Sequence, residues 1–268
     1  MSLLIRNKTK DDESYVGTCT HVNENKVEYE MSCPRRISWL KSMEKHGLRV
    51  KVALLNGIHA GFLYLMPIEV CPWPIEGKDL MVFPCLVSHS KFSKNRIGIQ
   101  LIKAAEDETK SQNRKGIATM AYFWDFWFMP AKYFLKLGFK VADQRGEEAI
   151  LWKQLDQEVN APYFPEEHYN FTPIEGKVVI DLFWNIFCLT SDVEAERVRD
   201  IVLEFGNEVI LNEYSAVDQK IFHQCGIERR IYVNGVMVEL GPEIEKDRLR
   251  NLIKTELNNV NQHHKKDP

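Results

Sequence analysis

Three basic residues, Lys91, Lys94 and Arg96, stand in a polar stretch between an apolar run and an amphipathic segment. The apolar run, residues 80–87, has the length of a buried strand, and the segment that starts at Ile97 has apolar residues on one helical face. The N-terminus of a helix presents free backbone N–H groups and the positive end of the helix dipole, and nearby cations add Coulomb attraction. This stretch therefore predicts a binding site for a phosphate group.

A second reactive position is Cys188, which precedes a predicted helix whose start resembles a capping box, Ser191 to Glu194. A thiol near a helix N-terminus can have a lowered pKa and act as a nucleophile. The chain has no Cys-x-x-Cys motif, so this thiol has no neighbour with which to form a disulfide. The scattered cysteines predict reduced, mostly buried thiols and no metal site.

Composition limits the class of protein. The chain has 268 residues, of which 44% are hydrophobic and 27% charged, so we expect one large or two ordinary globular domains. A formal net charge of -3 argues against general nucleic-acid binding. No apolar run reaches the roughly 18 residues of a membrane span, and residues 1–10 lack the apolar core of a signal peptide. We therefore expect a cytoplasmic protein with no membrane partner.

The elements that would position the basic stretch alternate between strands and helices. Asn56-Gly57 between two apolar runs predicts a β-hairpin over residues 48–66. Pro84 cannot donate a hydrogen bond within a sheet, so its strand must have an edge or a bulge there. The other elements expected in this half are strands at 1–7, 116–123, 139–141 and 149–153 and helices near 37–46, 97–112 and 129–137.

Residues 155–173 are rich in proline and aromatic residues, which predicts a linker. Its aromatic side chains indicate that the linker packs against the protein and does not extend freely into solvent. Beyond the linker, the predicted order of elements is βαβα-ββα, with a second Asn-Gly hairpin at Asn234-Gly235 and a last helix over residues 242–257. The predicted fold class is therefore α/β (α+β).

Residues 1–155 resemble the GNAT family of N-acetyltransferases. Four features carry the resemblance: Val87, the loop Ser93-Lys94-Asn95-Arg96-Ile97-Gly98, the helix start at residues 99–102, and Phe134-Leu-Lys-Leu-Gly-Phe139. The resemblance implies a mixed, splayed sheet flanked by helices, with acetyl-CoA in the V between the strands at 80–87 and 116–123. A bulge at Pro84 would let those strands splay.

The resemblance also implies which residues contact the cosubstrate. The pantetheine would pair with backbone groups of Leu86 and Val87. The pyrophosphate would rest on the backbone N–H groups of Lys94, Asn95, Arg96, Ile97, Gly98 and Ile99.

This chain departs from the family motif at three positions. Ser93 and Arg96 stand where the family has Gln or Arg and the first Gly, and the side chain of Arg96 would hinder a close approach of phosphate. A guanidinium there would compensate with charge-assisted hydrogen bonds. Phe134 stands where many members have a general-acid Tyr, and the neighbouring hydroxyl of Tyr133 is expected to point elsewhere.

The whole chain resembles one subgroup more closely, the YoaP-like acetyltransferases, which add a small C-terminal domain that is similar to thioredoxin. The motifs that carry this resemblance are Trp39-Leu-Lys41, Cys71-Pro-Trp-Pro-Ile-Glu76, the loop at 91–98, Lys132, and Asn160-Ala-Pro162. The expected domains are an acetyltransferase domain at 1–155, a linker at 156–175, a thioredoxin-like domain at 176–258 and a flexible tail at 259–268.

Acetyl transfer to an amine needs a neutral amine, a polarised carbonyl and a proton for the departing thiolate. The backbone N–H of Val87 could polarise the carbonyl. The candidate bases are His89, Glu69, Glu76 and Asp125. The aromatic residues Trp124, Phe126, Trp127 and Phe128 either line an acceptor pocket or seal the core.

The expected function is therefore acetyl-CoA-dependent transfer to a small-molecule or peptide amine by direct attack in a ternary complex. The expected partners are the amine acceptor and, in a homodimer, a second copy of the chain. Two alternatives stay open. One is a protein that binds CoA or acyl-CoA without turnover, and the other is a thiol-dependent redox protein that uses Cys188.

Overall fold

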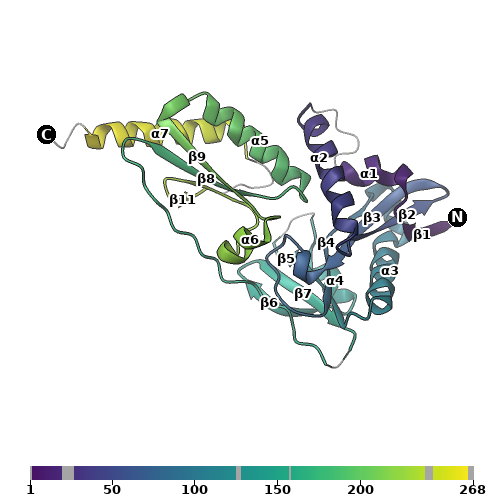
Figure 1. The fold of residues 1–268 in the computed structure, drawn as a ribbon. Helices are drawn as coiled ribbons and strands as arrows, with labels where there is room; N and C mark the ends of the chain where they lie inside the picture. The colour runs from purple at the N-terminus through teal and green to yellow at the C-terminus, as the bar shows by residue number, and fades with distance from the viewer. Residues whose placement is uncertain (1, 20–26, 125–127, 157, 239–243, 265–268) are drawn as a thin grey trace. The chain divides into compact units, whose positions relative to one another are not determined.

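The computed structural model describes residues 2–19, 27–124, 128–156, 158–238 and 244–264 (Figure 1). The chain divides into two compact units, of which the first contains Met1–Glu24 and Ile37–Pro165 and the second contains Asn25–Arg36 and Glu166–Pro268. The division at Pro165 falls inside the segment that the sequence predicts as a linker, and residues 25–36 join the second unit.

A mixed seven-stranded sheet forms the first unit, with the strand order β1-β2-β3-β4-β5-β7-β6. Neighbouring strands are antiparallel except β4 and β5, which are parallel. The strands are β1 Leu3–Asn7, β2 Arg49–Leu55, β3 Ile58–Pro67, β4 Leu80–Ser88, β5 Gly116–Tyr122, β6 Lys140–Arg145 and β7 Glu148–Gln154.

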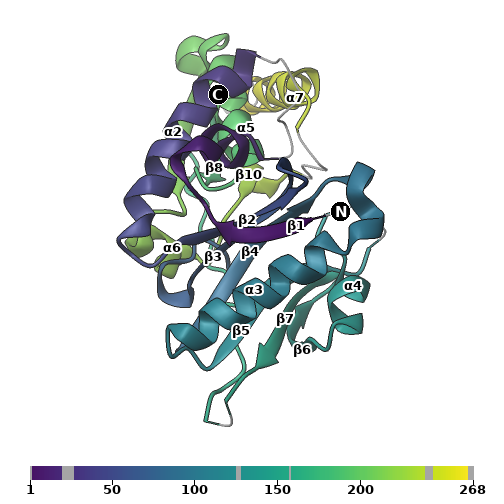
Figure 2. The same cartoon turned by 90° about the vertical axis from the view of Figure 1, so that its right-hand side faces the viewer.

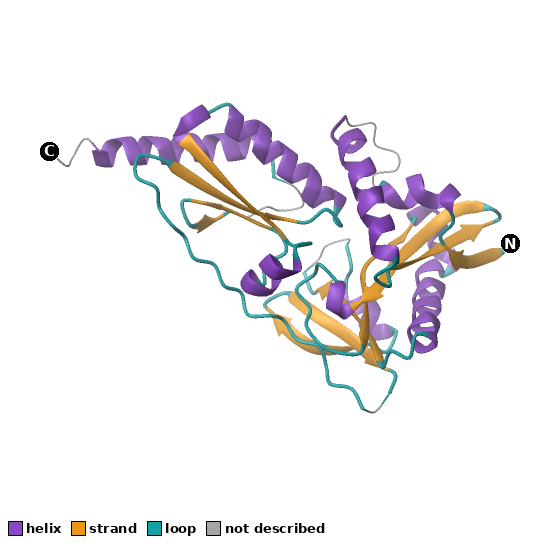
Figure 3. Ribbon diagram, viewed as in Figure 1, coloured by secondary structure: helices purple, strands orange, loops and turns teal. Residues whose placement is uncertain are grey.

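Helices cover both faces of this sheet (Figures 2 and 3). Helix α3 runs along one face, where its residues Ile97, Leu101, Ile102 and Ala105 enter the core, and α1 lies on the opposite face. The helices are α1 Glu13–Gly17, α2 Val27–Glu44, α3 Ile97–Ser111 and α4 Ala131–Lys136, with 3₁₀ turns at Lys10–Asp12, Ile68–Val70 and Ser90–Asn95. Only the part of α2 from Ile37 onward belongs to this unit. The expected mixed sheet flanked by helices is confirmed.

The predicted hairpin is confirmed between β2 and β3. Asn56 and Gly57 both have positive φ angles, of 51° and 81°, which is the backbone that a two-residue turn of type I′ requires. The helix that the sequence predicts near residues 37–46 is longer than expected, because α2 begins at Val27 and contains Pro34.

The predicted bulge at Pro84 is also confirmed. Val82 of β4 pairs with Met66 of β3 and Cys85 pairs with Tyr64, so that Phe83 and Pro84 together face the single residue between those two partners. Two residues opposite one define a β-bulge, and a proline is tolerated there because it has no N–H to donate.

Strands β4 and β5 diverge just beyond this bulge. Their parallel pairing ends where Val82 meets Ala118, although β4 continues to Ser88 and β5 to Tyr122. At the fork, the buried hydroxyl of Thr119 donates a 2.7 Å hydrogen bond to the carbonyl of Phe83. The expected splay between these strands is therefore present in the structure.

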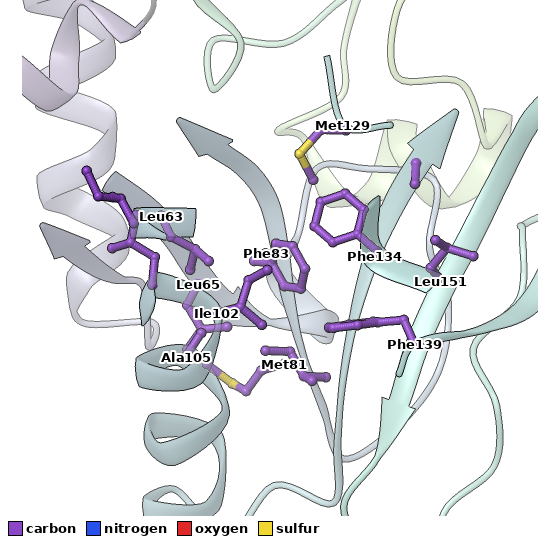
Figure 4. Close-up of a cluster of buried hydrophobic side chains, with 14 of the residues drawn as sticks. Leu63, Leu65, Met81, Phe83, Ile102, Ala105, Met129, Phe134, Phe139 and Leu151 are labelled. Carbon is purple, nitrogen blue, oxygen red and sulfur yellow. The ribbon is translucent and has the colours of Figure 1, made fainter. Parts of the chain in front are cut away.

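Aromatic side chains fill the core beneath the fork. Figure 4 shows the rings of Phe83, Phe134 and Phe139 near one another, with Met129 next to Phe134. Each pair of these three rings has centroids between 5.6 and 5.9 Å apart. Phe134 is only 1% exposed, so its role is to pack the core.

The second unit contains a four-stranded sheet with the order β11-β10-β8-β9. Strands β8 and β9 are parallel and the other pairs are antiparallel. Its elements are β8 Val178–Trp184, α5 Leu189–Leu203, a 3₁₀ turn Gly206–Glu208, β9 Val209–Ser215, α6 Gln219–Cys225, β10 Arg230–Val233, β11 Val236–Met237 and α7 Lys246–His264. The observed order is the βαβα-ββα order that the sequence predicts.

One helix start in this unit differs from the prediction. Helix α5 begins at Leu189 with Cys188 at its N-cap, so Ser191 lies within the first turn instead of capping it. The hydroxyl of Ser191 accepts a 3.1 Å hydrogen bond from the backbone N–H of Asn185. The predicted start of the last helix, Pro242, lies outside the described residues.

None of the helices in the described residues combines the length and the apolar character that crossing a membrane requires. The same residues also contain no group of three or more His, Cys, Asp or Glu side chains that could hold a metal ion.

Candidate active site

The loop between β4 and α3 turns through a left-handed residue. After the 3₁₀ turn Ser90–Asn95, Arg96 adopts φ 53° and ψ 31° and serves as the N-cap of α3. Glycine adopts this backbone conformation without strain, whereas a residue with a side chain rarely does. Arg96 reaches the same backbone shape, so the loop keeps its turn without the glycine.

The three basic residues of this loop have no carboxylate partner among the residues that the structure describes. Lys91, Lys94 and Arg96 are all exposed, and Lys91 lies 5.0 Å from the centre of the Phe92 ring. The loop therefore presents three cations that no described carboxylate neutralises, and an anion that binds here would meet them directly.

The start of α3 is open to a ligand. The side chain of Arg96 makes no capping hydrogen bond to the first turn, so the N–H groups of Ile97, Gly98 and Ile99 have no partner from that cap. The first N–H groups of a helix have no carbonyl of their own helix to bind. The uncapped amides and the unpaired cations lie on the same short stretch of chain.

Tyr133 of α4 lies against Gly98. The sequence did not predict this contact, since the hydroxyl of Tyr133 was expected to point elsewhere. A Cβ atom at position 98 would stand 2.6 Å from the phenol oxygen of Tyr133 and 3.7 Å from Leu86 Cδ2. The hydroxyl of Tyr133 therefore lies next to the α3 start and the β4 side of the fork. Burial raises the pKa of Tyr133, so this phenol keeps its proton at neutral pH.

His89 follows the end of β4. Its Nε2 lies 2.8 Å from the hydroxyl oxygen of Tyr15, and its backbone N–H donates to the carbonyl of Ala60. Burial, aided by the nearby charges of Lys91 and His59, lowers the pKa of His89 below its ordinary value. His89 is therefore neutral at pH 7 and able to take up a proton.

Glu69 lies at the other end of β4. Its two carboxylate oxygens accept hydrogen bonds of 2.7 and 3.0 Å from Arg114, which lies two residues before the start of β5. The first residues of β4 and β5 are paired there, and His89 follows the last residue of β4. At about 3.3 Å per strand residue, roughly 25 Å separates the two ends, so Glu69 and His89 do not meet.

Glu76 is engaged by the segment that follows β7. Its backbone forms an antiparallel bridge with Tyr163 through hydrogen bonds of 2.8 and 3.0 Å. A hydrogen bond to the Glu76 side chain raises the pKa of the Tyr163 phenol. Phe164 then donates its N–H to the Asp143 carboxylate of β6. Of the three candidate bases that the structure describes, His89, Glu69 and Glu76, only His89 lies at the end of β4 where the strands have diverged.

The aromatic residues after β5 are partly described. Trp124 is 46% exposed and stacks on Tyr122, with the ring planes 3° apart, and Phe128 packs against the core. The predicted candidates Asp125, Phe126 and Trp127 lie outside the described residues.

In the second unit, the turn that carries Cys188 is held by polar contacts. The backbone N–H of Cys188 donates to Asn185 Oδ1 at 2.8 Å. Arg36, which is 1% exposed, donates from Nε to the carbonyl of Phe187 at 2.5 Å. The part of α2 that belongs to this unit is thereby bonded to the residue before Cys188.

No known family model matches the chain, and no curated protein matches it either. Solved structures that are similar include the PaiA N-acetyltransferase of Thermoplasma acidophilum in complex with coenzyme A, at 18% identity and a TM-score of 0.42 over 57% of this chain and 99% of that one.

Two further similar structures are the acetyltransferase YncA of Salmonella typhimurium with acetyl-CoA and the ribosomal-protein-alanine N-acetyltransferase of Brucella melitensis. The first has 15% identity and a TM-score of 0.44 over 60% of this chain and 98% of that one. The second has 18% identity and a TM-score of 0.43 over 57% and 99% of the two chains.

Proposed function

We propose that the first unit is a GNAT-type N-acetyltransferase that moves an acetyl group from acetyl-CoA to an amine by direct attack in a ternary complex. One observation carries the proposal. The fork between β4 and β5 opens next to a loop that combines unpaired cations with uncapped amides at the start of a helix. This combination suits a long ligand with a diphosphate at one end and amide groups along its length.

The residues for binding acetyl-CoA follow from this geometry. Beyond Val82 the edge of β4 that faces β5 has no strand partner among the described pairs, so backbone groups near Leu86 and Val87 are available to the pantetheine amides. The amides at the start of α3, together with Lys94 and Arg96, would hold the diphosphate. The backbone of Asn95 belongs to the same turn.

Two side chains are placed to move protons. His89 is neutral, so it can accept the proton that the amine must lose before or during attack. The phenol of Tyr133 keeps its proton and lies against Gly98 at the start of α3, so it can donate a proton to the departing thiolate. Acetyl-CoA supplies the activated thioester, and the backbone N–H of Val87 would polarise its carbonyl.

Binding of acetyl-CoA is tested by calorimetry and by the shift in melting temperature. We expect Arg96→Glu to weaken binding at least tenfold, since it replaces a cation by an anion at the diphosphate. Lys78→Glu is the matched control, because Lys78 is an exposed lysine of the same unit outside the loop. An equal loss of affinity in Arg96→Glu and Lys78→Glu would contradict the proposal. So would the absence of binding by the unaltered protein at millimolar acetyl-CoA.

Turnover is tested separately with a panel of amines and peptides, by following the release of free thiol from acetyl-CoA. Binding without thiol release from any amine would favour the alternative of a CoA-binding protein without turnover. That alternative is motivated by Arg96, which replaces a glycine of the loop motif, and by Phe134, which fills the core at the place of the usual acid. Placement of the Tyr133 phenol at the fork favours the enzyme.

We further propose that the second unit is a thioredoxin-like domain of the YoaP-like subgroup, with the protein acting in the cytoplasm. Its strand order and its βαβα-ββα succession support this proposal. The bond from Arg36 to Phe187 favours a structural role for the turn that carries Cys188 over a redox role. We expect Cys188→Ser to leave acetyl transfer unchanged, and a loss of activity in this variant would favour the thiol-dependent alternative.

A further inference from the structure

The hydrogen bond between Tyr15 and His89 joins residues that are 74 positions apart in the chain. Tyr15 belongs to the short helix α1, and His89 follows β4. The Tyr15 side chain is 7% exposed, and its oxygen lies 2.8 Å from His89 Nε2. The proposed base therefore has a fixed and mostly buried neighbour.

Two ring contacts and the anchoring of its helix hold Tyr15 in place. Its ring stacks on the ring of His59, with centroids 4.2 Å apart and planes at 19°, and meets the edge of Phe62 at 5.2 Å. The helix that carries it is tied to β3, because the buried hydroxyl of Tyr64 donates to the carbonyl of Val16. The position of the phenol oxygen is therefore set by the fold.

His59 is itself anchored. Its Nε2 lies 2.7 Å from the carboxylate of Asp12, and Arg6 donates two hydrogen bonds to the same carboxylate. The stacked face of Tyr15 therefore rests on a ring whose orientation a buried acid fixes, because the Asp12 side chain is 1% exposed.

Either Tyr15 or His89 Nε2 could donate the hydrogen bond between them. The donor can be identified by asking which N–H or O–H proton would have no acceptor in the other arrangement. Among the described residues, the Tyr15 hydroxyl has one hydrogen-bond partner, His89 Nε2. Leaving a buried O–H without an acceptor is unfavourable, whereas Nδ1 of the half-buried imidazole can be reached by water. Burial also raises the pKa of Tyr15, so the phenol keeps its proton. The phenol therefore donates and Nε2 accepts.

We propose that the Tyr15 hydroxyl fixes His89 as the neutral tautomer with its proton on Nδ1 and relays the amine proton to it, so that the two residues act as one unit in proton uptake. This inference rests on the proposed function. The amine proton passes to the Tyr15 oxygen as the Tyr15 proton passes to His89 Nε2. Tyr15 ends as a neutral phenol and His89 as an imidazolium, which returns a proton to water.

The titratable and charged groups around this pair are known from the structure. Lys91, on the loop after His89, and His59, on β3, both disfavour the imidazolium. On the other side, Cys19 and Asp12 lie near the Tyr15 phenol and disfavour its ionisation. None of these groups is altered in the variant used below.

The tautomer is tested by NMR on the full chain, with the ¹⁵N shifts of the His89 ring identified from their loss in His89→Gln. We expect a protonated Nδ1 and an unprotonated Nε2 in the unaltered protein. In Tyr15→Phe the donor to the neutral imidazole is lost, so the pKa of His89 should rise, by about one pH unit. Tyr163→Phe, in which a hydroxyl that binds Glu76 is removed, should leave the His89 signals unchanged.

Catalysis provides the second measurement. In Tyr15→Phe we expect about a tenfold lower kcat with KM for acetyl-CoA unchanged, and an acid limb of the pH–rate profile that moves with the measured pKa of His89. A protonated Nε2, or a His89 pKa that Tyr15→Phe does not change, overturns the inference whether or not the protein acetylates amines.

An unchanged pH–rate profile in Tyr15→Phe overturns the role in proton transfer. A wild-type protein that shows the expected tautomer but releases no thiol with any amine refutes the proposed function, and the role in proton transfer with it.

Discussion

Gly98 of α3 lies against the Tyr133 hydroxyl of α4, and from this contact we predict how Gly98→Ala changes the stability of the protein. The added Cβ would lie 2.6 Å from the Tyr133 hydroxyl, where ordinary contacts begin at 3.4 Å. Forcing an extra methyl group into a packed site costs about 1–3 kcal/mol, and replacing a helical glycine by alanine returns about 0.5–1 kcal/mol. We therefore expect a loss of up to about 2.5 kcal/mol in the free energy of unfolding.

The effect of Gly98→Ala on the free energy of unfolding should change sign when the Tyr133 hydroxyl is removed. In a Tyr133→Phe background the nearest ring atom, Cζ, is 3.5 Å from the new methyl group, which is an ordinary contact. Gly98→Ala should then stabilise the protein by about 0.5–1 kcal/mol, because only the helix propensity term remains. The coupling between the two substitutions should be about 1–3 kcal/mol.

Urea unfolding of the four proteins, followed by tryptophan fluorescence, measures this cycle. The slope of free energy against urea should stay the same, so that the midpoints report stability. Tyr163→Phe is the control background, in which Gly98→Ala should cost as much as in the unaltered protein. A coupling below about 0.5 kcal/mol would mean that the Tyr133 hydroxyl does not lie against Gly98, and the proton donor at the fork would be lost with it.

Three other substitutions test the placement of single side chains. Asp12→Asn should cost about 2–3 kcal/mol at pH 7, since it leaves the guanidinium of Arg6 without its carboxylate. Burial opposes the charge of Asp12, but hydrogen bonds led by that from Arg6 hold its pKa well below its usual range. As the pH falls, the Asp12 carboxylate therefore takes up a proton in the unfolded chain before it does so in the folded protein. The stability that this carboxylate contributes is present above the ordinary Asp pKa and is lost as the pH falls below about 4. Urea unfolding measured at a series of pH values tests this. Glu69→Gln should change the free energy of unfolding by less than about 1 kcal/mol and leave turnover unchanged, because it breaks a surface pair with Arg114; a large loss of kcat would place Glu69 in the site after all. Phe134→Tyr should destabilise by about 1–3 kcal/mol, because its hydroxyl would be buried without a partner, and it should not raise kcat.

Local chemistry explains which features could be predicted from the sequence. The turn at Asn56 and Gly57 depends on two residues that tolerate positive φ, and the bulge at Pro84 depends on a missing N–H. Both requirements belong to the residues themselves and hold in any surroundings. The order of strands and helices follows from hydrophobic periodicity for the same reason.

The part of the candidate site that the sequence predicted is the part whose residues are close together in the chain. The loop that ends at Arg96 and the helix that follows it are neighbours in sequence, so the cations and the free amides could be placed together. The left-handed backbone of Arg96 was not predictable, because an arginine rarely adopts it and only the surrounding turn imposes it.

Contacts between distant segments were decided by the tertiary structure. Tyr133, and not Phe134, reaches the fork because the packing of α4 turns one ring into the core and leaves the other against Gly98. Glu69 lies far from His89 because the chain before β4 meets the start of β5.

The sequence by itself determined the turns, the bulge, the order of elements and the basic loop, since each depends on residues close together in the chain. The tertiary structure alone decided that Tyr15 meets His89 and that Tyr133 meets Gly98. The physical reason is that a side chain's partner across the fold depends on how helices pack on the sheet, and many sequences with the same pattern of apolar residues would pack them differently.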